Sequence, residues 1–373
     1  MSTRQTGVMR TAIIGLGKVA EKLHLPAYRA IEEIQIVGAS EINAERRQAM
    51  QARFHLPAVY EDSYTLIEKE QPELVIICSP PDSHKEFCLL ALRNGADVMC
   101  EKPFAPTVAD ADEIIAEAKR TSRLLAVNMQ YRYMEIYRTA RARLVSGEFG
   151  RLFFLQCWQQ MFSPLELERA TWRTQPKQST LYDFGSHPLD LMCYFFDALP
   201  TAVSANTPHI CADYASDVLV QMTLRFPNEC LATMVLNRVS HAPERFLEMR
   251  LDCEQASLHL SLGGRARASL EVKRQMEQIR FNPCFSFVLG GEARVEVQGC
   301  SRVLAREPHA AGVKATTAHM REFLAAKRNG VRSYKAAEHA RDFLRIIFAG
   351  YESAQTGQTV ELDNGSVTKQ DVF

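Results

Sequence analysis

The first third of the chain alternates short apolar runs with helix-like stretches, and this pattern limits the possible folds more than any other feature. The apolar runs cover 11–15, 34–40, 74–80, 96–100 and 124–128, and the helix-like stretches between most of them cover 18–31, 43–53, 83–94 and 107–121. Continuous apolar strands that alternate with helices indicate a parallel sheet covered on both faces. Residues 1–128 are therefore predicted to form a doubly wound Rossmann domain that binds a nucleotide.

The pattern changes after residue 128. Helices are expected near 134–146, 183–196, 313–328 and 335–355, and strands at 151–158, 216–226, 229–239 and 245–262, with an irregular polar segment at 163–180. The last three strand candidates alternate apolar and polar residues, as an antiparallel sheet with one solvated face does. The chain is therefore expected to be α/β, with a second domain, 129–373, that is α+β and contains a large, mostly antiparallel open sheet. This domain is expected to bind substrate and mediate oligomerisation, and its last helices are free to pack back on the first domain.

Charge and cysteine usage exclude several classes of partner. Lysine plus arginine and aspartate plus glutamate both number 44, so no overall field attracts nucleic acid or an anionic membrane. The ten cysteines are irregularly spaced, without a zinc-type cluster, and we expect reduced thiols and no metal site. The sequence shows neither a signal peptide nor an apolar run near the ~18 residues of a membrane-spanning helix. We therefore expect a cytoplasmic protein with no nucleic-acid or membrane partner.

A glycine-rich motif, GLGKVA, follows the first apolar run directly. It fits G-x-G-x-x-A at the mouth of a helix, where the first glycine permits a tight turn and the second lets backbone amides approach a pyrophosphate. The expected cofactor contacts are Gly15, Gly17, Lys18, Val19 and Ala20. The alternative interpretation is a glycine turn in a fold that binds nothing.

Glu41 ends the next predicted strand at the usual distance from this motif, about 20 residues on. A carboxylate there binds both ribose hydroxyls and repels a 2′-phosphate, which favours NAD over NADP. Arg46 lies close enough in the sequence to accept a 2′-phosphate if the helix start is turned differently, so NADP stays open.

A second motif, CSPPDSH, ends an apolar run at the same carboxyl edge of the predicted sheet, where open α/β folds bind ligands. We expect Ser79, Pro80 and His84 beside the cofactor. His84 is interpreted equally well as an exposed residue in the first turn of a helix.

A third motif, CEKPF, ends a further apolar run at that edge. Lys102 is predicted to point into the crevice where the nicotinamide lies and to stabilise a developing alkoxide, with Glu101 beside the cofactor. The alternative is a surface Glu-Lys pair before a proline turn, and the position at the sheet edge argues against it.

The second half contains LYDFGSHPLDLM, with Asp183, His187 and Asp190. On one continuous helix these three side chains share a face. Carboxylates on both sides hold a histidine in one tautomer, and an unperturbed pKa near 6.5 suits proton exchange at neutral pH. The alternative is an aspartate that caps its own helix beside a surface histidine.

Taken together, these motifs resemble the glucose-fructose oxidoreductase and inositol dehydrogenase family (Gfo/Idh/MocA). The resemblance runs through nearly the whole chain, from GLGKVA through SPPDSH, CEKPF, YRY, SGEFGRL and DFGSHPLD to ESAQTGQTVEL. In such proteins the lysine of E-K-P and the aspartate and histidine of D-x-G-x-H meet around the substrate carbon that faces the nicotinamide. The resemblance places these catalytic roles on Lys102, Asp183 and His187 and makes Asp190 the relay partner of the histidine. It also implies a homodimer or homotetramer formed through the open sheet.

One segment departs from the family pattern. Family members often carry a run of glycines before the catalytic aspartate, where this chain has KQST, so bulkier residues lie beside the expected substrate. Trp172 and Arg173 precede that loop at a family-like spacing. With Arg132 and Lys177 they would offer a stacking face and cationic contacts for a sugar or sugar phosphate. Each is interpreted equally well as a surface or interface residue.

The sequence therefore predicts an NAD-dependent dehydrogenase or ketoreductase that acts on a secondary hydroxyl or ketone of a sugar, cyclitol or sugar derivative. In oxidation, His187 would take the hydroxyl proton while Lys102 stabilises the alkoxide, and the rate should rise with pH through one group titrating near neutrality. Two alternatives follow from the same resemblance: a redox-neutral glycosidase that uses NAD transiently, and a non-catalytic sensor that binds the cofactor and a protein partner. The intact lysine, aspartate and histidine set weighs against the sensor.

Overall fold

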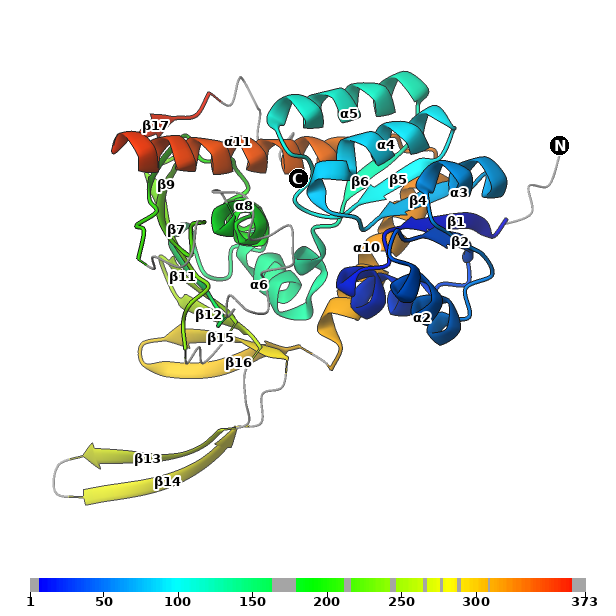
Figure 1. The fold of residues 1–373 in the computed structure, drawn as a ribbon. Helices are drawn as coiled ribbons and strands as arrows, with labels where there is room; N and C mark the ends of the chain where they lie inside the picture. The colour runs from blue at the N-terminus through cyan, green and yellow to red at the C-terminus, as the bar shows by residue number, and fades with distance from the viewer. Residues whose placement is uncertain are drawn as a thin grey trace.

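The computed structural model describes residues 7–162, 179–210, 216–241, 246–263, 267–275, 278–286, 290–307 and 309–363. These residues build two large sheets with helices between and around them, and a separate hairpin (Figure 1). The hairpin consists of β13, Arg267–Gln275, and β14, Gln278–Ser286, which pair with each other and project from the body of the molecule.

Six parallel strands form the first sheet, in the order β3-β2-β1-β4-β5-β6. The strands are β1 Met9–Ile14, β2 Ile34–Ser40, β3 Val59–Tyr60, β4 Leu74–Ile77, β5 Asp97–Cys100 and β6 Leu125–Val127. The predicted doubly wound Rossmann sheet is confirmed. The strand β3 was not expected because two residues are too few to form an apolar run.

Helices cover both faces of this sheet. On one face lie α3 Ser63–Glu70, α4 His84–Arg93 and α5 Val108–Thr121, and on the other lie the π-helix η1 Ala20–His24, α1 Leu25–Tyr28, α2 Ala44–Phe54 and α10 Ala311–Arg328. Neighbouring strand residues alternate between the two buried clusters: Ile14 and Ile77 pack with the first set, Ile13 and Ile76 with the second. Burial on both faces explains why these strands are continuous apolar runs in the sequence.

Nine strands form the second sheet, in the order β16-β15-β12-β11-β7-β10-β9-β8-β17. Their bounds are β7 Leu152–Gln160, β8 Ala202–Asn206, β9 Leu219–Phe226, β10 Cys230–Asn237, β11 Leu247–Cys253, β12 Ser257–Leu262, β15 Gly291–Val297, β16 Cys300–Arg306 and β17 Val360–Glu361. Strands β7 and β10 pair in parallel and the other neighbours are antiparallel, which confirms the predicted sheet. The strand expected over 245–262 is instead the hairpin β11–β12, which turns at Glu254 and Gln255.

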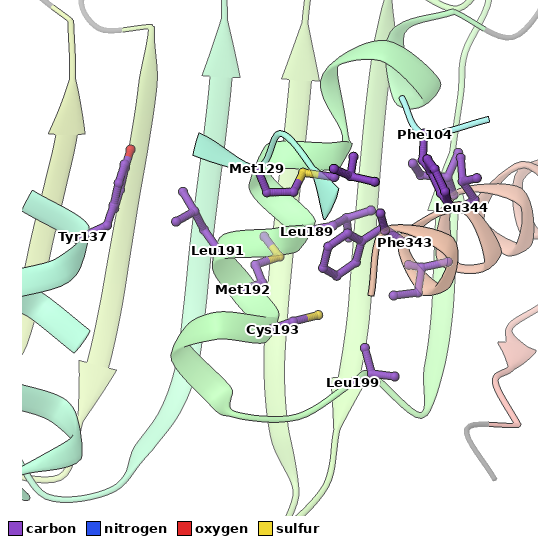
Figure 2. Close-up of a cluster of buried hydrophobic side chains, with 14 of the residues drawn as sticks. Phe104, Met129, Tyr137, Leu189, Leu191, Met192, Cys193, Leu199, Phe343 and Leu344 are labelled. Carbon is purple, nitrogen blue, oxygen red and sulfur yellow. The ribbon is translucent and has the colours of Figure 1, made fainter. Parts of the chain in front are cut away.

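The inner face of the second sheet is covered by helices α6 Glu135–Val145, α8 Thr180–Phe184, α9 Ser186–Phe196 and α11 Lys335–Thr356. Figure 2 shows Leu189 and Met192 of α9 in the same buried cluster as Phe343 and Leu344 of α11. Helix α11 also contacts α5 and β6, so this cluster runs without a break from the first sheet to the second. Within the described residues, no helix is both long and apolar enough to cross a bilayer.

Candidate active site

The glycine loop joins β1 to η1 at the carboxyl edge of the first sheet. Gly15 has a φ of +86°, and a Cβ on it would lie 2.7 Å from a backbone nitrogen of the loop after β4, so the tight turn requires glycine. A Cβ on Gly17 would meet no described atom within 4 Å, which leaves this backbone open to a ligand. Lys18 is exposed, Val19 is half-buried, and Ala20 packs against the sheet. The loop therefore fits a pyrophosphate at the start of a helix.

Glu41 follows β2 and faces the glycine loop. Its Oε2 accepts the backbone N–H of Leu16 at 3.0 Å, and its Oε1 accepts the N–H of Asn43 at 3.0 Å. Arg46 is held nearby, where its Nε donates to the Leu16 carbonyl oxygen at 2.7 Å and its Nη2 donates to Glu21 at 2.6 Å. A carboxylate therefore stands where ribose hydroxyls are expected, and the guanidinium that would neutralise a 2′-phosphate is already engaged.

His84 locks the loop after β4 to the turn after β5. Its imidazole is fully buried, with Nε2 2.9 Å from the Ser79 carbonyl oxygen and Nδ1 2.9 Å from the Pro103 carbonyl oxygen. Burial lowers the pKa of His84 although the carbonyl oxygens oppose the shift. The interpretation of His84 as an exposed residue is therefore wrong. Ser79 is half-buried and accepts a hydrogen bond from Ser83 at 2.7 Å, whereas Pro80 is exposed.

A helix break separates two of the catalytic candidates. The sequence predicts one helix over 183–196, but α8, Thr180–Phe184, ends before α9 begins at Ser186. Pro188 explains the break, because proline has no N–H to donate to the carbonyl four residues earlier. Asp183 and His187 therefore belong to different helices, and the prediction of a single helix over 183–196 is wrong.

Lys102 meets Asp183 at the carboxyl edge of the first sheet. Its Nζ donates to Asp183 Oδ1 at 2.9 Å and to the Asp183 carbonyl oxygen at 2.9 Å. The aspartate side chain is 3% exposed and the lysine side chain 18% exposed, so water screens the pair only weakly. An ammonium has three N–H donors, and two of them are used among the described residues. The third is available to a substrate oxygen, as the stabilisation of an alkoxide requires.

His187 stacks on Tyr131, which lies in the 3₁₀ turn η3, Gln130–Tyr133. The ring centroids are 3.9 Å apart and the planes differ by 6°. His187 Nδ1 is buried and has no hydrogen-bond partner in the described part of the chain. Burial, together with the charge of Lys102, lowers the pKa of His187 to about 3. The imidazole is therefore uncharged at neutral pH, which differs from the expectation that His187 titrates near neutrality.

Asp190 pairs with Arg132 and not with His187. Its Oδ1 lies 2.7 Å from Arg132 Nε and 2.5 Å from Nη2, while Oδ2 has no hydrogen-bond partner among the described residues. Burial raises the pKa of Asp190 despite the guanidinium. The pair lines a cavity of about 50 Å³ with His319 and His339. The predicted contact between Asp190 and His187 is not formed, because a guanidinium compensates a buried carboxylate better than a neutral imidazole does.

Glu101 lies behind the turn that carries Lys102. Its Oε1 is 2.5 Å from His24 Nε2 and accepts a hydrogen bond from Asn128 Nδ2 at 2.6 Å, and its Oε2 accepts the Lys102 backbone N–H at 3.2 Å. The residue is 6% exposed. The carboxylate is therefore directed into the protein, whereas the sequence led us to expect it beside the cofactor.

Two supporting residues were not singled out in the sequence. Asp217 accepts the backbone N–H groups of Ser179 at 2.5 Å and Leu181 at 2.9 Å, and so caps the helix that carries Asp183. A cap supplied by a residue distant in the chain has no local sequence signal. Tyr131 lies in the YRY motif, which marks the position but not the stacking on His187.

Part of the predicted substrate set lies outside the described residues, namely Trp172, Arg173 and Lys177. Arg132 lies within the described residues, and its ion pair with Asp190 orients the guanidinium. In the described ranges, no group of three His, Cys, Asp or Glu side chains is arranged to hold a metal ion.

A glycine loop with an acidic residue after β2, together with a lysine, aspartate and histidine near the carboxyl edge of the same sheet, defines the class of NAD-binding oxidoreductases. Comparison with known families agrees with this. The GFO/IDH/MocA oxidoreductase family, with its NAD-binding Rossmann fold, matches residues 9–129, and the GFO/IDH/MocA C-terminal domain matches residues 137–280. The chain belongs to the GFO/IDH/MocA family, as its motifs predicted.

Several relatives have named activities. D-glucoside 3-dehydrogenase of Escherichia coli is 28% identical over 215 residues, which cover 55% of this chain and 58% of that protein. D-apiose dehydrogenase of Paraburkholderia graminis is 24% identical over 353 residues, which cover 94% of this chain and 89% of that protein. The crystal structure of myo-inositol 2-dehydrogenase from Lactobacillus plantarum has a TM-score of 0.76 at 18% identity and covers 95% of this chain and 99% of that chain. The first match spans little more than half of its relative, and the structural match shows a shared fold.

Proposed function

We propose that this protein is an NAD-dependent dehydrogenase, or a ketoreductase in the reverse direction, that acts on a secondary hydroxyl of a sugar, cyclitol or sugar derivative. The observation that carries the proposal is the 2.9 Å contact between Lys102 Nζ and Asp183 at the carboxyl edge of the dinucleotide-binding sheet. The uncharged imidazole of His187 lies within electrostatic reach of both groups. The named activities of a glucoside, an apiose and a myo-inositol dehydrogenase among the relatives support the substrate class.

Oxidation removes a proton from the hydroxyl oxygen of the substrate and a hydride from the carbon that carries this hydroxyl. A bound nicotinamide would supply the acceptor for the hydride that leaves the substrate carbon. Lys102 donates its remaining N–H to the substrate oxygen and stabilises the negative charge that develops there. Asp183 holds the ammonium in place. His187 takes the hydroxyl proton, and we assign this step to Nε2 because Nδ1 is enclosed.

The remaining candidates have supporting roles in this proposal. The glycine loop and Glu41 hold the dinucleotide, with Ser79, Pro80 and His84 shaping the neighbouring loop. Arg132 contacts the substrate or its phosphate, with Asp190 as the group that orients it. Contacts from Trp172 and Arg173 stay predictions.

An absorbance assay at the NADH band tests the proposal. Purified protein is incubated with NAD or NADP and a panel of sugars, cyclitols, sugar phosphates and nucleotide sugars. NADH formation with one compound class is the expected result. Tight NADH binding without turnover of any compound would contradict a dehydrogenase, and release of an aryl group from a model glycoside without net NADH would indicate the redox-neutral glycosidase instead.

Glu41→Ser is expected to weaken NAD binding and to improve NADP binding. The carboxylate would otherwise accept hydrogen bonds from the ribose hydroxyls, and the loss of such charge-assisted bonds costs about 1.5–3 kcal/mol, or roughly 10- to 100-fold in affinity. Fluorescence titration with NADH and NADPH measures both constants. Glu45→Ser, at an exposed position of α2, is the control. Unchanged discrimination in Glu41→Ser would remove Glu41 from the cofactor site.

We also propose that the outer face of the second sheet forms a homodimer or homotetramer. Helices cover only the inner face of this sheet in the described structure. On the outer face the apolar residues Phe154 and Leu231 lie opposite each other in the register of β7 and β10, as do Trp158 and Val235. Analytical ultracentrifugation should give at least the mass of a dimer, and a monomer at micromolar concentration would contradict this. The division at 128/129 and the cytoplasmic location stay predictions.

A further inference from the structure

A buried ion pair lies beneath the candidate site and takes no part in the chemistry proposed above. His24 is fully buried and Glu101 is 6% exposed, and the atoms His24 Nε2 and Glu101 Oε1 are 2.5 Å apart. A buried pair is stable only when further hydrogen bonds satisfy both partners. His24 Nδ1 lies 2.6 Å from the Tyr28 hydroxyl oxygen, and Glu101 Oε1 also accepts the Asn128 amide N–H at 2.6 Å.

This pair connects segments that carry different parts of the site. His24 ends η1, the helix that begins at the glycine loop. Glu101 directly precedes Lys102 and accepts its backbone N–H at 3.2 Å. Asn128 follows β6, two residues before η3, and its Oδ1 lies 3.2 Å from His319 Nδ1 on α10. One carboxylate therefore joins the helix of the glycine loop, the lysine turn and the segment that leads to Tyr131.

The groups that face His24 are Tyr28 on the same helical segment, Cys78 after β4, Glu101 after β5 and His319 on α10. Burial favours a neutral imidazole, but the Glu101 carboxylate that faces Nε2 opposes it, and the pKa of His24 is raised well above its ordinary value. Burial likewise opposes the carboxylate, but His24 lowers the pKa of Glu101 to about 2. Both partners are therefore charged at neutral pH.

We propose that Glu101 is a positioning residue for Lys102 and makes no direct contact with the cofactor. Its ion pair with His24 fixes the lysine turn against the helix that begins at the glycine loop, so that Nζ meets Asp183. The kinetic consequence of this inference rests on the proposed hydride transfer, whereas the ion pair itself does not.

Glu101→Gln preserves the size of the side chain and an oxygen acceptor but removes the charge that faces His24. We expect kcat to fall roughly tenfold or more, as a small misplacement of a catalytic group does. The KM for the sugar and the dissociation constant for NADH should stay within about a factor of two, because Glu101 touches neither ligand. Steady-state kinetics and NADH fluorescence measure these constants.

Asp97→Asn is the matched control. Asp97 opens β5, the strand that Glu101 follows, and is 4% exposed. Like Glu101 it accepts a backbone N–H, from Leu124 at 2.9 Å, and pairs with a cation, Lys327 at 2.7 Å. This variant should lose thermal stability without a loss of kcat. If Glu101→Gln does not fold, His24→Gln removes the other charge of the pair and should show the same separation of kcat from NADH affinity.

Histidine NMR tests the ion pair without any substrate. The His24 ring should stay protonated between about pH 6 and 8 in the wild-type protein, above the ordinary histidine pKa, and should be neutral in this range in Glu101→Gln, because burial then favours the uncharged ring. A neutral His24 in the wild-type protein would overturn the ion pair whatever the reaction. A fall in NADH affinity equal to the fall in kcat would make Glu101 a cofactor contact. A lower melting temperature with unchanged kcat would leave Glu101 a purely structural residue. Either kinetic result overturns the positioning role.

Discussion

Lys102→Met is expected to lower kcat by roughly 10²–10³-fold, the usual effect of removing one donor to a developing oxyanion. Methionine keeps the length of the side chain but has no N–H to offer the substrate oxygen. The affinity for NADH should change little, because Lys102 Nζ is engaged with Asp183 and not with the glycine loop. The measurements are kcat with the preferred sugar and a fluorescence titration with NADH.

Lys102→Met leaves the buried Asp183 carboxylate without its lysine, so this substitution can also lower the stability of the fold. Two further variants separate an effect on the reaction from an effect on stability. Lys327→Met takes the lysine from another buried aspartate, Asp97, and should lower the melting temperature but not kcat. The double variant Lys102→Met/Asp183→Asn removes both charges and should regain stability without regaining kcat. A loss of NADH affinity as large as the loss of kcat in Lys102→Met would show that the lysine binds the cofactor, and the proposed role at the alkoxide would be wrong.

His187→Gln is expected to lower kcat/KM for oxidation by roughly 10²–10⁴-fold, the range for loss of a general base. The pH dependence of the wild-type enzyme gives a second test. The base must be unprotonated, and kcat/KM reports the ionisations of the free enzyme. Because burial and Lys102 lower the pKa of His187 to about 3, the active form prevails from about pH 5 upward. This residue should therefore impose no acid limb on kcat/KM between about pH 5 and 9.

The control for this variant is His259→Gln, an exposed histidine on β12, which should keep the wild-type rate and profile. A wild-type profile with an acid limb centred at about pH 6.5, absent from His187→Gln, would mean that the imidazole titrates at its ordinary pKa. The burial argument would then fail, although the role as base would survive. Equal rates in His187→Gln and wild type would remove the residue from the reaction.

The two sheets differ in how far the sequence predicts them. Strands of the first sheet are buried on both faces and so appear as uninterrupted apolar runs, which located five of its six strands. In the second sheet, alternation predicted half-exposed strands but not where they turn. Alternation predicts one strand over 245–262 in place of the β11–β12 hairpin, because Glu254 and Gln255, at its turn, are neither glycine nor proline.

In the candidate site, too, the features that depend on neighbouring residues in the sequence were predictable, and the contacts between distant segments were not. That Lys102 lies at the carboxyl edge follows from its place after a parallel strand, and Pro188 was a visible sign that the helix over 183–196 breaks. The partners of Glu101 and Asp190 were not predictable, because they come from η1 and η3, which pack there only in the folded chain. The lowered pKa of His187 arises from burial, a property of the packed structure.

Helix α11 has a consequence for how substrate enters. Its 22 residues extend over about 33 Å. They contact β8 of the second sheet, β6 of the first sheet, and helix α5, which covers the first sheet. A continuous helix that packs on both sheets holds them at a fixed separation. A hinge motion between the sheets would therefore have to bend α11 or break its apolar contacts. We expect the two sheets to unfold together, with α11 amides exchanging as slowly with deuterium as those of the central strands. Access to the proposed nicotinamide crevice would then depend on the movement of loops and not on a hinge between the two sheets.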